Sequence, residues 1–129
     1  NYPVLAKLAK TLPIFPDIKN ERSMLYIDNL SELLCQIMIR KKRGIFWPQN
    51  AEYSNTSELV KWIAEANNHR ILVSKFWNTG IKLASKLPGR FKGVANKAFG
   101  NMAYDKELSS YDFEYQLTTL KESIKRTEG

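Results

Sequence analysis

Hydrophobic residues recur at helical spacing in several stretches of this chain, separated by polar or proline-containing turns. The clearest stretch follows Asp28, where one helix face would carry Leu30, Leu33, Leu34, Ile37 and Met38. Asp28 is a favourable N-cap, because its carboxylate can accept hydrogen bonds from the free N–H groups of the first helical turn. The basic run 40–43 followed by Gly44 is typical of a helix C-terminus, with Gly44 as the C′ residue.

Further helices are predicted at both ends and in the middle of the chain. Pro3 suits a first helical turn, and Pro13 would stop the helix that begins there. Two capping-box patterns mark later starts: residues 55–58, before a helix that ends near 67–68, and residues 119–122, before a final helix. The buried faces of these two helices are predicted to carry Leu59, Trp62, Ile63 and Ala66 in the first, and Leu120 and Ile124 in the second. Asp105 is expected to cap a short turn, and two more helices are predicted over 76–87 and 94–99.

Short apolar runs predict a few strands. Residues 13–16 contain two prolines and therefore suit an edge strand, which we expect to pair antiparallel with 23–27. Residues 45–47 and 71–73 predict two more strands, the first of them parallel because it lies between helices. The expected fold class is α/β, as one domain over residues 1–129 that is mostly helical with a few short strands. Strands 45–47 and 71–73 would leave an exposed sheet edge, where either a homodimer or a swapped contact can form.

The net charge of +7 is concentrated in one part of the chain. Eight cations stand against a single acid, Asp105, between residues 70 and 106: Arg70, Lys75, Lys82, Lys86, Arg90, Lys92, Lys97 and Lys106. Such a segment can meet nucleic acid, a membrane surface or a phosphorylated ligand, or it can simply be a solvated face. No apolar run approaches the roughly 20 residues that span a bilayer, so no membrane partner is expected.

One cysteine excludes an internal disulfide, which favours a reducing cytoplasmic compartment. Within the predicted helix, Cys35 is expected to be a small buried hydrophobic residue. The single histidine, His69, is expected to be a polar loop residue, because no cluster at metal-ligand spacing accompanies it.

Several catalytic and cofactor motifs are absent from the sequence. No G-x-G-x-x-G turn follows a strand, and no Tyr-x-x-x-Lys pair occurs. A single histidine and a single cysteine provide no evident nucleophile–base pair. The chain is therefore expected to hold no cofactor or metal and no complete catalytic machinery.

The order of motifs resembles the C-terminal, substrate-binding part of the NAD-dependent epimerase/dehydratase family, the extended short-chain dehydrogenase/reductases, and especially the UDP-glucose 4-epimerase type. The resemblance covers essentially the whole chain. It rests on these segments: Asn1-Tyr2-Pro3, Leu-Pro-Ile-Phe at 12–15, Arg22 to Asp28, Gly-Ile-Phe-Trp at 44–47, Thr-Ser-Glu-Leu at 56–59, Ala-Tyr-Asp at 103–105 and Leu-Lys-Glu-Ser-Ile at 120–124.

This resemblance implies a Rossmann-type parent whose N-terminal half holds NAD and the catalytic tyrosine and oxidises a sugar carbon transiently. It also implies that this chain binds the nucleotide-sugar, with UDP-sugar as the expected substrate. Arg22 matches the arginine that grips the pyrophosphate, and Asp28 matches a structural acid. The other implied contacts are Asn1 near the pyrophosphate and Pro13 and Phe15 along the uracil. The candidates for a second phosphate-binding residue are Arg90, Lys92 and Lys97. The stretch 75–97 departs from the epimerase pattern.

Two hypotheses of different class follow. We favour the substrate-binding part of a sugar-nucleotide epimerase or dehydratase, inactive alone, with the nucleotide-binding half of the same protein as its partner. The alternative is a stand-alone basic helical module that binds nucleic acid or another phosphorylated partner. That alternative is less favoured because no helix-turn-helix, zinc spacing or stacking-strand signature is present.

Overall fold

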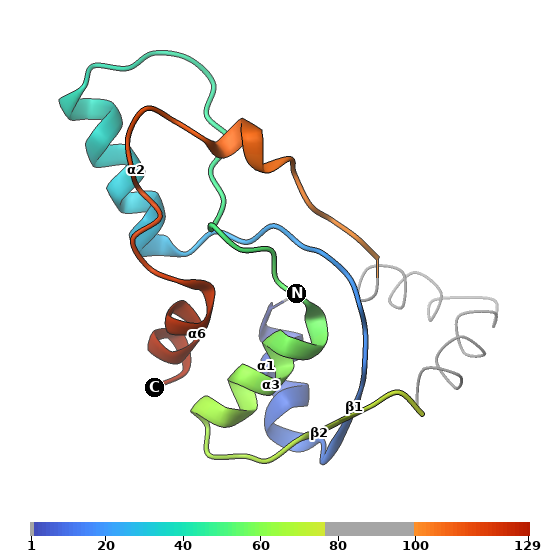
Figure 1. Cartoon of the computed structure of the whole chain (residues 1–129). Helices are drawn as coiled ribbons and strands as arrows, with labels where there is room; N and C mark the ends of the chain where they lie inside the picture. The colour runs from blue at the N-terminus through green and yellow to red at the C-terminus, as the bar shows by residue number, and fades with distance from the viewer. Residues whose placement is uncertain (1, 77–99) are drawn as a thin grey trace.

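A computed structural model describes residues 2–76 and 100–129 (Figure 1). Within these residues the fold is mixed α/β, with four α-helices, one 3-10 helix and a two-stranded parallel sheet. The elements in order are α1 (Tyr2–Thr11), β1 (Ile14–Pro16), α2 (Ile27–Ile39), α3 (Thr56–Ala66), β2 (Leu72–Ser74), η1 (Lys106–Ser109) and α6 (Leu120–Glu128). The helices predicted over 76–87 and 94–99 lie outside the described residues, apart from Phe76.

The sheet pairs β1 with β2 in parallel, with Phe15 opposite Val73. The strand predicted over 71–73 is confirmed with a shift of one residue, but the predicted antiparallel pairing of 13–16 with 23–27 is wrong. Residues 23–26 form no strand, because their segment contacts other partners instead. A parallel pair needs a long crossover between its strands, and here α2 and α3 lie in that connection.

Helix α3 is the centre of the hydrophobic core, where it packs against α1, α6 and β1 (Figure 1). Ala9 of α1 is fully buried in this core, as are Val60 and Ile63 of α3. Leu120 and Ile124 supply the buried side of α6, as predicted. The predicted start of α3 is also confirmed, since the Asn55 side chain accepts hydrogen bonds from the backbone N–H groups of residues 57 and 58.

Helix α2 departs from its predicted pattern at its start. It begins at Ile27, and Tyr26 is the N-cap residue without a side-chain capping bond, so the prediction of Asp28 as N-cap is wrong. Asp28 lies in the first turn, where its carboxylate accepts a 3.3 Å hydrogen bond from the Arg126 guanidinium. An acid in the first turn of a helix interacts favourably with the helix dipole, even where it is not the N-cap residue.

The buried face of α2 is narrower than predicted. Leu33 and Asn29 are its buried residues, whereas Leu34 and Met38 are exposed. The prediction that Cys35 is buried is wrong, because its side chain is exposed on α2. On this buried face Asn29 forms hydrogen bonds instead of a hydrophobic contact. Its side-chain NH₂ donates to Asn50 Oδ1 at 3.0 Å and to the Thr118 carbonyl at 2.9 Å.

The segment after α2 forms no strand, which corrects the prediction for residues 45–47. Ile45 is 84% exposed, and the Trp47 N–H donates a 2.7 Å hydrogen bond to the Tyr111 hydroxyl rather than to a neighbouring strand. The aromatic ring of Phe46 packs edge-on against Tyr111. Gly44 is not the C′ residue, since α2 ends at Ile39 with Arg40 as its C-cap.

The two capping predictions near the C-terminus are confirmed. Asp105 caps η1 by accepting a hydrogen bond from the Glu107 N–H at 3.1 Å. Thr119 caps α6 by accepting one from the Glu122 N–H at 3.3 Å. No helix in the described part of the chain is both long and apolar enough to cross a membrane.

Candidate functional site

Arg22 lies where three chain segments cross. Its backbone N–H donates to the Ser54 carbonyl at 3.0 Å, and its own carbonyl accepts from the Ser54 N–H at 2.9 Å. On the opposite side, Arg22 forms a parallel bridge with Met102, whose carbonyl accepts from the Ser23 N–H at 2.9 Å. The half-buried Arg22 side chain therefore starts from a backbone that is hydrogen-bonded on both sides.

Buried polar side chains extend this crossing toward α3. Asn20 accepts a hydrogen bond from the Thr56 N–H at 2.9 Å and donates one to the Gly100 carbonyl at 3.3 Å. Ser57 of α3 accepts from the Ile18 N–H at 2.6 Å. These contacts attach the segment after β1 to the first turn of α3. Each side chain also bonds to a backbone group that burial would otherwise leave without a hydrogen-bond partner.

An open polar cavity of about 740 Å³ lies beside this network. Its lining residues are Asp17, Lys19, Asn20, Glu21, Asn55, Ser57, Glu58, Lys61, Val73 and Asn101. The volume is in the range of small-molecule sites, and the lining mixes acids with two lysines. Such a lining can hydrogen-bond hydroxyl groups, and its lysines can approach an anionic group.

On the other side of Arg22, a second network runs toward η1. Ser23 donates to Gln49 Oε1 at 2.6 Å and accepts from the Tyr104 N–H at 2.9 Å. Gln49 is fully buried, and its side-chain NH₂ donates to Ser109 Oγ at 2.8 Å and to the Asp105 carbonyl at 3.0 Å. No sequence signal marked Gln49, because its partners come from positions far along the chain.

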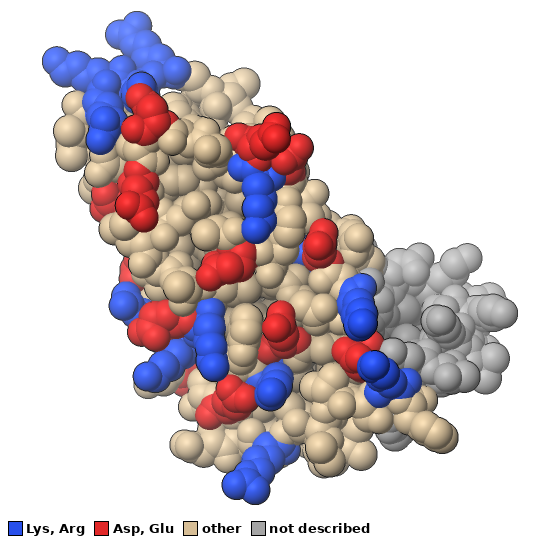
Figure 2. Space-filling model, viewed as in Figure 1, with Lys and Arg blue, Asp and Glu red and all other residues tan. Residues whose placement is uncertain are grey.

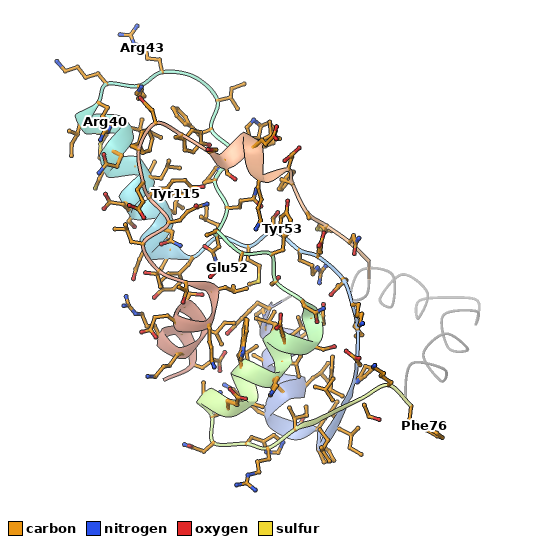
Figure 3. The ribbon with its side chains drawn as sticks, viewed as in Figure 1. Arg40, Arg43, Glu52, Tyr53, Phe76 and Tyr115 are labelled. Atoms are coloured by element: carbon orange, nitrogen blue, oxygen red, sulfur yellow. The ribbon has the colours of Figure 1, made fainter. Side chains whose placement is uncertain are left out.

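A group of aromatic side chains at the surface, Trp47, Tyr53 and Tyr104, lies beside this second network. The Tyr53 hydroxyl donates to the Tyr104 carbonyl at 2.7 Å, and the Lys106 ammonium lies 4.5 Å from the centre of the Tyr53 ring (Figure 3). Trp47 packs against Tyr104 with ring centroids 5.9 Å apart. Sequence reasoning missed this group, which brings together residues from three separate segments.

Three of the residues predicted from the sequence to bind the nucleotide-sugar lie in the described part of the chain, and their surroundings differ. Pro13 is exposed, and its carbonyl accepts the Leu72 N–H at 2.9 Å within the strand pairing. Phe15 is 5% exposed and belongs to the hydrophobic core, and Arg22 lies at the crossing. None of the three lines the cavity described above. Asn1, Arg90, Lys92 and Lys97 lie outside the described residues.

Basic side chains gather where α2 ends, and we call residues 40–43 the basic tip (Figures 2 and 3). Lys42 forms a 2.6 Å ion pair with Asp112, and its hydrogen bond to that carboxylate lowers the pKa of Asp112. The Arg40 guanidinium lies 5.4 Å from the centre of the Phe113 ring. Lys41 and Arg43 are exposed. Most of the basic stretch predicted over 70–106 falls on residues 77–99, which are not described.

The described residues contain no cluster of three or more side chains that could hold a metal ion. A ring nitrogen of His69 lies 3.0 Å from the Leu12 carbonyl oxygen, which places this histidine beside the turn between α1 and β1. Cys35 is exposed on α2.

Comparisons with protein-family models, curated proteins and solved structures find no match to this chain.

Proposed function

We propose that this chain is the nucleotide-sugar-binding part of an NAD-dependent epimerase or dehydratase, in which Arg22 holds the diphosphate. One structural observation carries this proposal. The backbone of Arg22 bonds to Ser54 on one side, and its neighbours Glu21 and Ser23 bond to Met102 on the other. Ser54 and Met102 are both far from Arg22 in the sequence. A binding residue needs such a rigid base, because a side chain anchored on a mobile loop loses affinity as it becomes ordered.

The guanidinium group suits the proposed ligand chemically. It is planar and permanently charged, and it can donate two parallel hydrogen bonds to phosphate oxygens. The Ser23–Gln49 network next to Arg22 supports its position from one side, and the Asn20–Thr56 hydrogen bond supports it from the other. The open polar cavity beside residues 17–21 offers space for the polar groups of a bound sugar.

The residues of this chain do not fit NAD itself. The sequence contains no Gly-rich turn that would let a dinucleotide approach the backbone at a helix N-terminus. In the proposed enzyme, NAD and the reacting sugar carbon would be handled by the other half of the protein. This chain would bind and orient the nucleotide diphosphate.

Calorimetric titration of the purified chain with UDP tests the role of Arg22. Arg22→Ala should weaken binding by about tenfold or more, since a hydrogen bond to a charged group contributes about 1.5–3 kcal/mol. The substitution keeps the backbone bonds to Ser54 and Met102, so the circular dichroism spectrum should not change. Arg43→Ala is the matched control, because Arg43 is an exposed cation at the basic tip and its loss should leave the affinity unchanged.

The same titration with a single-stranded oligonucleotide tests the alternative class. A nucleic-acid module would lose affinity steeply with salt, because phosphate binding releases counterions. A nucleotide-sugar site should instead prefer UDP over the other nucleoside diphosphates at constant salt. Oligonucleotide binding with a steep salt slope and no preference among the bases would reject the proposal.

The reading frame upstream of the Asn1 codon provides an independent test. We expect it to encode a Gly-rich strand–helix turn and a Tyr-x-x-x-Lys pair over about 150–200 residues, the size of one nucleotide-binding domain. An unrelated sequence or an immediate start codon there would contradict the proposed parent enzyme.

A further inference from the structure

Helix α2 carries an apolar stripe that faces away from the rest of the protein. Ile27, Leu34 and Met38 are 62%, 50% and 67% exposed. With 3.6 residues per turn, these positions lie on the side of the helix opposite to the buried Asn29 and Leu33. We call residues 27, 31, 34 and 38 the outer stripe.

The spacing of the outer stripe is that of a helix that packs against another helix. Successive members of the stripe are four, three and four residues apart. This is the spacing of the apolar a and d positions in helices that pair as coiled coils. Ser31 is the one polar member. A continuous apolar stripe that a folded protein exposes commonly marks a surface of interaction. The outer stripe therefore predicts an interface.

The charges around the stripe indicate what covers it. The acids of α2, Asp28 and Glu32, lie in its first two turns, where Arg126 pairs with both Asp28 and Glu122. The basic tip follows the last turn, and Lys42 in it pairs with Asp112. Among these groups, three acids face one arginine at the start of α2, and four cations face one acid at the basic tip. An antiparallel copy of the same helix would bring the acidic end of one α2 toward the basic tip of the other. An anionic bilayer would attract the basic tip but repel the acidic end, so the charge distribution favours a second copy.

We propose that two copies of this chain associate through antiparallel α2 helices, with Ile27 of one copy facing Met38 of the other and Ser31 facing Leu34. A two-fold axis then passes through the middle of the stripe, and the interface is isologous. This dimer does not depend on the proposed nucleotide-sugar function.

Light scattering after size-exclusion chromatography tests the assembly. The unmodified chain should show twice the mass of one chain, and Leu34→Glu should raise the dimer Kd by about tenfold or more, because it buries an unpaired charge at the centre of the interface. Leu72→Glu is the matched control: Leu72 is 70% exposed but lies on β2, so the dimer should persist. A chain that stays monomeric at its highest soluble concentration overturns the proposal, as does a dimer that Leu72→Glu dissociates and Leu34→Glu does not.

Disulfide trapping tests the direction of the helices. On a Cys35→Ser background, we would prepare Ile27→Cys and Met38→Cys as separate proteins, so that each carries one cysteine. Antiparallel pairing predicts a disulfide when the two proteins are mixed under mild oxidant and little when either is oxidised alone, because bridging needs Cα atoms within about 7 Å. Self-bridging of each variant would indicate parallel helices and reject this arrangement.

Discussion

Tyr2 and Glu128 lie 126 residues apart in the sequence, and the Tyr2 hydroxyl donates a 2.9 Å hydrogen bond to the Glu128 carboxylate. The same carboxylate forms a 2.7 Å ion pair with Lys10 and accepts a 3.0 Å hydrogen bond from the Asn67 side chain. The Glu128 side chain is only 5% exposed. The last turn of α6 is thus tied to α1 and to the end of α3.

This contact predicts that stability falls in acid. Burial alone raises the pKa of Glu128, but hydrogen bonds from Lys10, Asn67 and Tyr2 outweigh it, and the pKa lies below its usual value. A lowered pKa in the folded state means that the carboxylate stabilises the fold above its unfolded pKa, and that this stabilisation is lost as pH falls through the folded value. Urea unfolding between pH 7 and about pH 3 measures the loss.

The matched variant for the acid prediction is Glu128→Gln, which keeps the shape of the side chain and cannot ionise. We expect it to lower the free energy of unfolding at pH 7 by about 1–3 kcal/mol, because it weakens charge-assisted bonds to a buried group. Its stability should also change less between pH 7 and pH 3 than that of the unmodified chain. An equal acid sensitivity in both proteins would assign the effect to other carboxylates.

Stability should also fall in strong base, for the opposite reason. Burial, the hydrogen bond to Glu128 and the charge of that carboxylate all raise the pKa of Tyr2. A raised pKa means that the neutral hydroxyl stabilises the fold below its unfolded pKa, and that this stabilisation is lost as pH rises through the folded value. Tyr2→Phe should lose about 1 kcal/mol at pH 7 and show a weaker alkaline decline in urea unfolding.

Asn29 should be a main attachment of α2 to the rest of the protein. Its side chain donates to Asn50 and to the Thr118 carbonyl and accepts the Thr118 N–H at 2.9 Å. Asn29→Ala should cost about 2–4 kcal/mol of unfolding free energy, since it leaves buried polar groups without partners. Cys35→Ala, at an exposed position of the same helix outside the outer stripe, should change stability by less than about 0.5 kcal/mol. Chemical denaturation of both variants, with hydrogen exchange along α2, measures the difference.

The features that the sequence predicted correctly are those that depend on neighbouring residues. Asn55, Asp105 and Thr119 cap their helices because each acceptor lies within three residues of its donors. Leu59 and Ile63 of α3 were predicted to face the core and are buried there, whereas Val60 and Ala64 were missed. The buried residues Leu120 and Ile124 of α6 were predicted as well. Local geometry determines such features, whatever the rest of the fold does.

The features that were missed depend on distant partners. The pairing of β1 with β2 joins residues 14–16 to 72–74, and nothing near residues 14–16 favours that partner over residues 23–27. Residues 45–47 have strand-like composition, but they contact Tyr111 and Tyr104 instead of a strand. In the candidate site, the chemistry of an arginine could be inferred from its sequence context. The polar networks that fix Arg22 through Ser54 and Gln49 could not.

Gln49 should stabilise the crossing that holds Arg22. Its fully buried side chain contacts Ser23, Ser109 and the Asp105 carbonyl. Gln49→Leu keeps a similar volume but leaves these groups unpaired, so we expect a loss of about 2–4 kcal/mol in chemical unfolding. Gln36→Leu is the control, because Gln36 bonds within α2 to Glu32 and Arg40, and its loss should cost less than about 1 kcal/mol. Equal losses in the two variants would show that the Gln49 network adds nothing to the fold.

Ala9 sets how closely α1 approaches α3. It is fully buried, and it shares the hydrophobic core with Val60 and Ile63. Ala9→Leu adds three carbons where there is no space, and such overpacking typically costs about 1–3 kcal/mol. Val4→Leu is the control on the same helix, because Val4 is exposed and can accept the extra carbon. Thermal unfolding of both variants should show a lower Tm for Ala9→Leu alone, and an unchanged Tm would mean that α1 can move away from α3 without loss of packing.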